Sequence, residues 1–335
     1  MTTYSSRAAV IGFGRQTAEG SALTVPKFET PMGGGLAGPE RSVQELPWTN
    51  DSQDSVGDYV ERVGGIVEAT LPVLPVSAGA ILQGILGSLS TGAGPPYPHT
   101  FTPADVLPFM TWFYSQPGGN YWTVADVKLG SWALNFAPGT PLEASVQGMG
   151  KTTTRSGSKW SAATLVETVD PFFTYIGSTV KFDAAATPAT STVRNISNGS
   201  ISVNRNIDTI QTDAVNYQFM AEQKRDIAIS LDNTVFENND LINTVFTGST
   251  SGTTMSGQVA YGSYEMKFIG SDQAAAATRS LTLTFPRVLW TISRVPAADP
   301  QGSTLRYTVT GKASKPSSGA TMTAVLINAS AGTVY

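Results

Sequence analysis

The stretch Ile66-Val-Glu-Ala-Thr-Leu71 recurs 160 residues further along the chain as Asp226-Ile-Ala-Ile-Ser-Leu231. In both copies every second residue is apolar, which is the pattern of a β-strand with one buried and one exposed face. A repeat at a fixed distance indicates that one structural unit occurs twice. The sequence therefore predicts a duplicated β-rich protein.

Further matches lie on both sides of this strand at nearly the same spacing. In each half, four apolar residues have the spacing of one face of a short helix. They are Ile81, Leu82, Ile85 and Leu86 in the first half and Leu241, Ile242, Val245 and Phe246 in the second half. The shorter matches are Ser42–Gln44 with Ser202–Asn204 and Thr91-Gly92 with Ser251-Gly252. Near the end of each half Gly139–Gly148 matches Gly302–Gly311, and the three extra residues are an ordinary loop insertion.

Each half reads as strands around one helix. Period-two segments such as 142–146, 281–285 and 305–309 predict strands, and Ser77 and either Asn239 or Asp240 stand where helix N-caps are expected. We expect an all-β fold with minor α, made of two duplicated β-sandwich or barrel domains, each with one flanking short helix. The domains should cover residues 1–165 and 166–335, because 152–168 is polar and lacks a clean periodicity.

Two long polar segments occupy the same place in both halves, Pro47–Gly64 and Asn204–Lys224. Loops of this length usually carry function or contacts. Both hold large side chains, which suits a hairpin that orders against a neighbouring chain. A flexible surface loop is the alternative interpretation.

Composition excludes most enzyme chemistry. The chain has no cysteine and one histidine, so thiolate zinc sites, cysteine nucleophiles and multi-histidine metal centres are excluded. There are 21 Lys and Arg residues against 25 Asp and Glu, with no basic run for phosphate binding. No cofactor or metal is expected. Residues 1–15 lack the apolar core of a secretory signal, and the apolar stretch 65–89 is interrupted by polar residues and proline, so we expect no membrane span and a soluble intracellular product.

The remaining motifs favour structural roles. Gly148-Met-Gly-Lys-Thr152 has the end of a phosphate-binding loop but lacks its first glycine, so Lys151 is expected to be a solvated charge. The sequence lacks the G-x-S-x-G motif that would provide a nucleophilic serine for His99 to activate, so His99 is expected to be structural or on the surface. Carboxylates in the first long loop could form a glycosidase pair, but solvated charges are the commoner role of such residues. The aromatic run Trp112–Tyr114 together with Tyr121-Trp122 could stack on a sugar, but packing is the commoner role of aromatic strand residues.

The pattern resembles the tail tube proteins of long-tailed bacteriophages (siphophages), specifically their tandem type with two related tube domains. The resemblance covers most of the chain. It is carried by short segments, namely the glycine-rich Ile11–Ser21, the extended 24–30, Gly65–Leu71, Ala80–Ser88, His99–Thr102, Lys128–Leu134 and Leu142–Lys151.

The resemblance implies a non-enzymatic virion protein of the tail tube, assembled in the host bacterial cytoplasm. Such chains polymerise as stacked rings into a hollow tube through which DNA passes without specific binding. Single-domain tube proteins form six-fold rings, so two domains per chain imply trimers with pseudo-six-fold symmetry. Expected partners are further copies of the chain, a tape measure protein, a tail tip or initiator, and a tail terminator.

On this reading the two long loops are candidates for contacts between rings. The candidate contact residues are Trp48, Asp51, Asp54, Asp58, Tyr59, Ile207, Ile210, Asp213, Tyr217 and Phe219. The alternative function is a carbohydrate-binding or adhesive β-sandwich protein of the capsid decoration or tail spike type.

Overall fold

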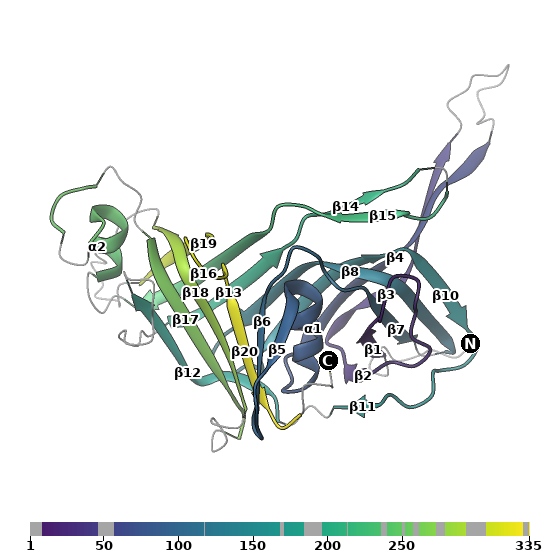
Figure 1. Ribbon diagram of the computed structural model, residues 1–335, viewed down its shortest axis with the longest axis horizontal. Coiled ribbons are helices and arrows are strands. Elements are labelled where there is room, and N and C mark those ends of the chain that lie inside the picture. The colour runs from purple at the N-terminus through teal and green to yellow at the C-terminus, as the bar shows by residue number, and fades with distance from the viewer. Residues whose placement is uncertain are drawn as a thin grey trace, which may run out of the picture.

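The computed structural model describes residues 9–45, 57–116, 118–167, 171–183, 196–212, 214–235, 240–249, 252–256, 261–272, 279–292, 306–330 and 335. These residues form twenty strands and two short helices, α1 (Ser77–Leu86) and α2 (Asp240–Thr247). The expected all-β fold with minor α is confirmed (Figure 1). Among the described residues, no helix combines the length and the apolar character that a membrane crossing requires.

One continuous run of antiparallel strands crosses the whole molecule. Its first four strands come from the first half of the chain and its last four from the second half. In spatial order they are β3 (Gly34–Glu45), β4 (Asp58–Pro72), β9 (Glu143–Gly150), β8 (Asn120–Phe136), β13 (Ile196–Asn204), β16 (Asp226–Val235), β19 (Arg306–Ala313) and β18 (Ser280–Thr291).

The alternating residues of the two repeated segments lie where the pattern predicts. Val67, Ala69 and Leu71 of β4 are buried, as are their counterparts Ile227, Ile229 and Leu231 of β16. Successive side chains of a strand point to opposite faces, so one face of the run is core and the other is open to solvent.

Further strands cover the core face. In the first half the layer is β11 (Leu165–Val166), β2 (Phe28–Pro31), β1 (Val10–Arg15), β7 (Met110–Gln116), the first part of β8 and β10 (Thr152–Ser156). In the second half it is β12 (Phe173–Asp183), β17 (Tyr261–Gly270), β18, β20 (Thr323–Asn328), β6 (Tyr97–Pro103) and β5 (Gly87–Thr91).

The hydrophobic core is continuous through both halves of the chain. Helix α1 is entirely buried and packs against β6 and β8. Tyr335 packs its ring against Phe28, His99 and Phe101 of the first half, and β20 pairs with β6. Strands that pair within the first half extend to Val166, one residue past the expected boundary.

Two local expectations are wrong. Ser77 makes no side-chain cap on α1, because the carboxylate of Glu167 accepts hydrogen bonds from the backbone N–H groups of Val76 and Ser77 at 2.7 and 2.6 Å. Burial raises the pKa of Glu167 although these hydrogen bonds oppose the shift. The match of 42–44 with 202–204 is out of register, since Val43 lies opposite Val60 whereas Val203 lies opposite Ile227.

Candidate assembly interface

The two halves of the chain are joined by paired strands. Residues Ser131–Phe136 of β8 pair antiparallel with Gly199–Asn204 of β13, and we call this contact the seam. A side chain at Gly199 would place its Cβ 2.4 Å from the carbonyl oxygen of Ser230 and 2.7 Å from the ring of Phe136. The seam is thus hydrogen-bonded and too tight at this point for any residue but glycine.

A second joint surrounds His99, which is completely buried. Its Nδ1 lies 3.0 Å from Thr91 Oγ1, and its Nε2 lies 3.1 Å from Asn328 Oδ1 and 3.0 Å from the carbonyl oxygen of Ser330. The histidine therefore links the β5–β6 hairpin to the last strand. Its partners are structural, in agreement with the expectation of a structural histidine.

At both ends of the eight-strand run, part of the outer strand has no partner among the described residues. Among the described residues β3 pairs only with β4. On the other side of the molecule, β18 pairs with β17 as far as Leu289, and beyond this residue that side of the strand has no partner in the described part of the chain. Unpaired strand edges are templates for pairing with another chain.

The solvent face of the run is polar and weakly charged. Its exposed or half-exposed side chains are mostly hydroxyls and amides. They include Glu68, Ser131, Asn135, Glu143, Gln147, Ser200, Ser202, Asn204, Ser230, Thr310 and Lys312. One lysine among these groups does not make a phosphate-binding surface.

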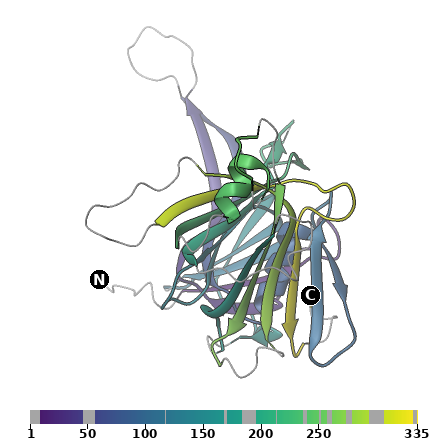
Figure 2. The ribbon, with the colours of Figure 1, turned by 90° about the vertical axis from the view of Figure 1, so that its left-hand side faces the viewer.

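The first long segment is a projecting hairpin. Residues 58–64, expected in a loop, belong to β4, and β3 and β4 stay paired out to Glu45 and Asp58. We call 41–45 with 58–63 the arm; Figures 1 and 2 show it rising away from the body. Asp58 and Tyr59 are exposed on it, whereas Trp48, Asp51 and Asp54 lie outside the described residues.

The second long segment is also a hairpin, but it lies against the first half of the same chain. It consists of β14 (Ile207–Ile210) and β15 (Phe219–Glu222), and we call residues 207–222 the strap. Asn206, with a φ of 46°, turns the chain between β13 and the strap. Ile207 is half-buried, Ile210 and Phe219 are exposed, and Asp213 is outside the described residues.

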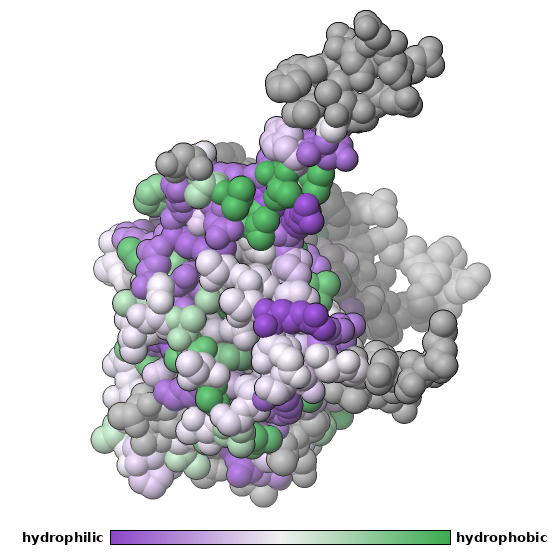
Figure 3. Space-filling model, turned by 90° about the vertical axis from the view of Figure 1, so that its right-hand side faces the viewer, coloured by the Kyte–Doolittle hydropathy of each residue, from purple (hydrophilic) through white to green (hydrophobic). Residues whose placement is uncertain are grey.

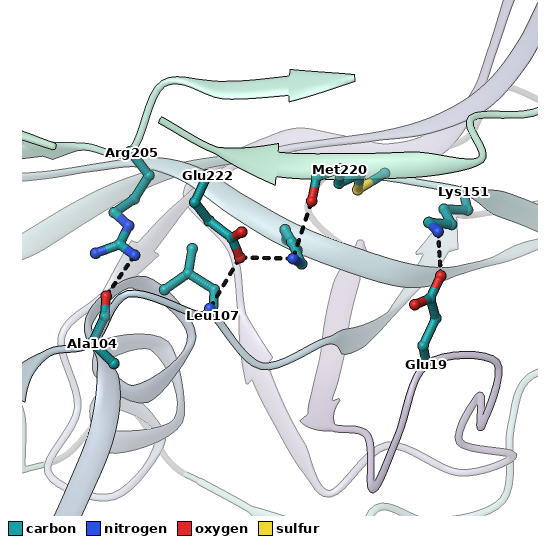
Figure 4. Close-up of polar contacts among 8 residues, drawn as sticks. Glu19, Ala104, Leu107, Lys151, Arg205, Met220 and Glu222 are labelled. Atoms are coloured by element: carbon teal, nitrogen blue, oxygen red, sulfur yellow. Dashed lines mark hydrogen bonds and ion pairs between the residues drawn. The ribbon is translucent and has the colours of Figure 1, made fainter. Parts of the chain in front are cut away.

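An ion pair fixes the strap to β8 (Figure 4). The ammonium of Lys128 lies 2.6 Å from Glu222 Oε1 and donates to the carbonyl oxygen of Met220 at 3.2 Å. The backbone N–H of Leu107 donates to the same carboxylate at 3.0 Å. Both charged side chains are largely buried. Burial opposes ionisation of Glu222, but the hydrogen bonds from Lys128 and Leu107 outweigh it and hold the pKa of Glu222 below its usual value.

Other cations hold the ends of the strap. Arg205 is almost completely buried and donates to the carbonyl oxygen of Ala104 at 2.8 Å; burial and the neighbouring Arg225 lower its pKa. Lys151 is buried between Glu19 and the carbonyl oxygen of Gln218. The expectation that Lys151 is a solvated charge is therefore wrong, because the strap covers it.

The strap also contacts the base of the arm. Gln211 Nε2 donates to the carbonyl oxygen of Glu61 at 2.7 Å, and the N–H of Val63 donates to the carbonyl oxygen of Val215 at 2.8 Å. Tyr217 is 3% exposed, with the guanidinium of Arg62 5.3 Å from the centre of its ring. Tyr217 is thus an intrachain contact that ties the strap to the arm.

Sequence reasoning missed Lys128, Glu222 and Arg205. The available signal was Lys128 itself, a charge inside the apolar strand 124–134, since a buried charge requires a partner. Trp112 and Phe113 are buried in the core layer, whereas Tyr114, Tyr121 and Trp122 are half-buried. This placement agrees with the packing interpretation of that run. The described residues also hold no cluster of three His, Asp or Glu side chains that could bind a metal ion.

Comparison with known proteins adds one finding. The model of a family described as phage tail tube protein matches residues 6–313, which is nearly the whole chain. No curated protein matches the chain. The match includes both halves, the seam, the arm and the strap. The chain therefore belongs to the phage tail tube protein family, whose members are structural virion components and not enzymes.

Proposed function

We propose that this chain forms the tail tube of a long-tailed phage by closing into rings of three chains, which stack into a hollow tube for DNA passage. The observation that carries the proposal is the seam, together with the unpaired strand edges at the ends of the same strand run. The chain holds one strand junction internally, and in its described part β3 and the end of β18 past Leu289 have unpaired outer sides that could form the same junction with a neighbour.

The pairings support the division into two duplicated domains, 1–165 and 166–335. In each half the strands pair in the same order, β3–β4–β9–β8–β7 and β13–β16–β19–β18–β17. The glycines Gly148 and Gly311, matched in the sequence, lie opposite Val67 and Ile229, so the strand pairing shifts β16 by two residues from the sequence match of Val67 with Ile227 and keeps the same face buried. On this alignment β13 residues 199–204 correspond to β3 residues 35–40.

The alignment gives a register for the junction between chains. Within the chain Ser131 lies opposite Asn204. Ser131 lies opposite Gln147, and Thr291 lies opposite Thr310. The sequence repeat aligns Gln147 with Thr310, so Ser131 of the first half corresponds to Thr291 of the second half. Asn204 corresponds to Glu40. We therefore expect Thr291 of one chain to lie opposite Glu40 of the next chain, and three such junctions alternate with three seams around the ring.

When the strand runs of three chains close into a ring, their polar faces all lie on the same side of the ring wall. We assign this face to the lumen, because hydroxyl and amide groups with few cations let DNA slide without the phosphate contacts that would hold it. The proposed contacts between rings are Asp58 and Tyr59 of the arm, Trp48, Asp51 and Asp54 of the segment between its two strands, and Ile207, Ile210, Asp213 and Phe219 of the strap. Tyr217 is not among these contacts, because it ties the strap to the arm within one chain.

The remaining expectations follow from this assembly. The tube is a siphophage virion component assembled in the bacterial cytoplasm, with a tape measure protein, a tail tip and a terminator as partners. The burial of Trp112 and Phe113 removes these two rings from the platform that the sugar-binding alternative requires.

Negative-stain electron microscopy of the concentrated protein, with mass determination of isolated rings, tests the proposal. We expect hollow tubes and rings of three chains with six-lobed outlines. Rings of six chains, or a protein that stays monomeric when a tail tip complex is added, would contradict it.

Engineered disulfides test the register, since the chain has no cysteine. The pair Glu40→Cys with Thr291→Cys should link chains into covalent trimers on oxidation, because directly opposed strand residues lie within disulfide reach. Ser131→Cys with Asn204→Cys is the positive control and should link only within a chain. Ser42→Cys with Thr291→Cys, two residues out of register, should not link.

A further inference from the structure

The largest group of exposed apolar side chains lies on the arm and the strap. Ten large hydrophobic residues are exposed in the described part of the chain, and five of them are on these two hairpins. The five are Val43, Tyr59, Ile210, Val215 and Phe219. Figure 3 shows hydrophobic residues gathered where the arm leaves the body. Such a concentration on one surface marks an interaction site.

Four of these residues, Tyr59, Ile210, Val215 and Phe219, lie where the arm and the strap meet, although they come from different halves of the chain; Val43, opposite Val60, faces the other side of the arm from Tyr59. Ile210 and Phe219 are directly opposite each other in the strap. Val215 is in the turn of the strap, where its carbonyl oxygen accepts the N–H of Val63 in β4. Tyr59 lies two residues from Glu61, which accepts a hydrogen bond from Gln211 of the strap. The strap therefore lies beside the arm along β4.

The direction of the arm identifies what covers this surface. Strand pairing at the seam and at the proposed junctions extends the run sideways around the ring, so the strands run between the two ring faces with a tilt. The arm continues β3 and β4 past a register shift between Ser42 and Val43, and the two strands stay paired out to Glu45 and Asp58. It must leave the ring through one face, where the next component of the tube is another ring.

We propose that each chain presents one composite stacking surface, built jointly by the base of the arm and the outer side of the strap, and that its partner is a chain of the next ring. This inference rests on the proposed function. It gives a ring of three chains three stacking sites rather than six, because the two halves do not carry equivalent hairpins. The first-half hairpin projects, whereas the second-half hairpin is folded down to complete the same site.

A difference between the halves accounts for the unequal hairpins. Lys128, which fixes the strap, lies opposite Met149 of β9. The repeat aligns Met149 with Lys312 of β19, and the residue opposite Lys312 is Leu289. The second half therefore has leucine where the first half has the strap-binding lysine. In the ring, a neighbouring chain therefore offers the arm a leucine at the position from which Lys128 holds the strap, and the arm stays free for the next ring.

Three single substitutions of exposed residues test the proposal. Tyr59→Ser changes the arm, Phe219→Ser changes the strap, and Met255→Ser is the matched control on a second-half loop away from both hairpins; the exposed fractions are 49%, 59% and 70%. Tube elongation is followed by light scattering and electron microscopy, and ring closure by ring mass. Thermal unfolding of each monomer verifies that the variants fold.

We expect Tyr59→Ser and Phe219→Ser each to slow elongation at least about tenfold while rings of three still form, and Met255→Ser to elongate like the wild type. The elongation rate of the double variant should fall by less than the product of the two single fold-decreases, because both residues belong to the same stacking surface. Wild-type elongation of Phe219→Ser would overturn the composite surface, as would equal loss in Met255→Ser. A wild-type protein that forms neither rings nor tubes would instead refute the proposed function.

Discussion

Replacing Lys128 by methionine tests whether the strap is held by its buried ion pair. The ammonium and the Glu222 carboxylate are 2.6 Å apart, with side chains 6% and 13% exposed. The substitution leaves Glu222 charged and largely buried without its ammonium partner, while the Leu107 N–H still donates to it. Removing one partner of a buried pair costs about 3 to 5 kcal/mol. Because Glu222 keeps this hydrogen bond and some exposure, we expect a cost near the lower limit, about 3 kcal/mol.

The assay is urea denaturation of the monomer at pH 7, combined with amide hydrogen exchange of residues 219–222. Glu222→Gln should also destabilise, since it leaves the ammonium without a counter-charge. The double variant Lys128→Met with Glu222→Gln should cost at least about 1 kcal/mol less than the sum of the single losses, because no unpaired charge remains.

The matched control is Arg279→Met, which breaks a more exposed ion pair with Asp272, with side chains 37% and 38% exposed. Pairs of this kind contribute about 1 kcal/mol or less. If Lys128→Met cost no more than Arg279→Met, or if the effects of Lys128→Met and Glu222→Gln were additive, the ion pair would not be what holds the strap.

Three further predictions address pH, the seam and the arm. Because the pKa of Glu222 lies below its ordinary value of 4.5, the stability contributed by the ion pair is complete above about pH 4.5 and is lost as pH falls through the lowered pKa. Hydrogen exchange of the strap should report this loss in the wild-type protein. The same pH response in a Glu222→Gln protein would refute the prediction. Gly199→Ala should destabilise by about 1 to 3 kcal/mol in thermal unfolding because its Cβ would meet Ser230 and Phe136, whereas Gly157→Ala, with open space around it, should be neutral. Deleting 52–58 should leave the circular dichroism of the monomer unchanged but block polymerisation, and tubes of normal length from this variant would exclude the arm from stacking.

Much of the local structure could be predicted from the sequence. The alternation at Val67, Ala69 and Leu71 selects a strand with one buried face, because successive strand residues point to opposite sides. The apolar spacing at Ile81 and Ile85 selects a helix for the same kind of geometric reason. The absence of cysteine and the single histidine excluded thiolate and multi-histidine chemistry before any fold was known.

Only the tertiary structure decided how the two long segments differ. Both are polar hairpins by sequence, yet one projects and the other lies on the first half. The reason is a contact between Lys128 and Glu222, which are 94 residues apart in the chain. Likewise Glu167, 90 residues from Ser77, provides the hydrogen bonds expected from a local cap. Local patterns specify which face of an element is buried, but the pairing of distant polar groups depends on which elements the fold brings together.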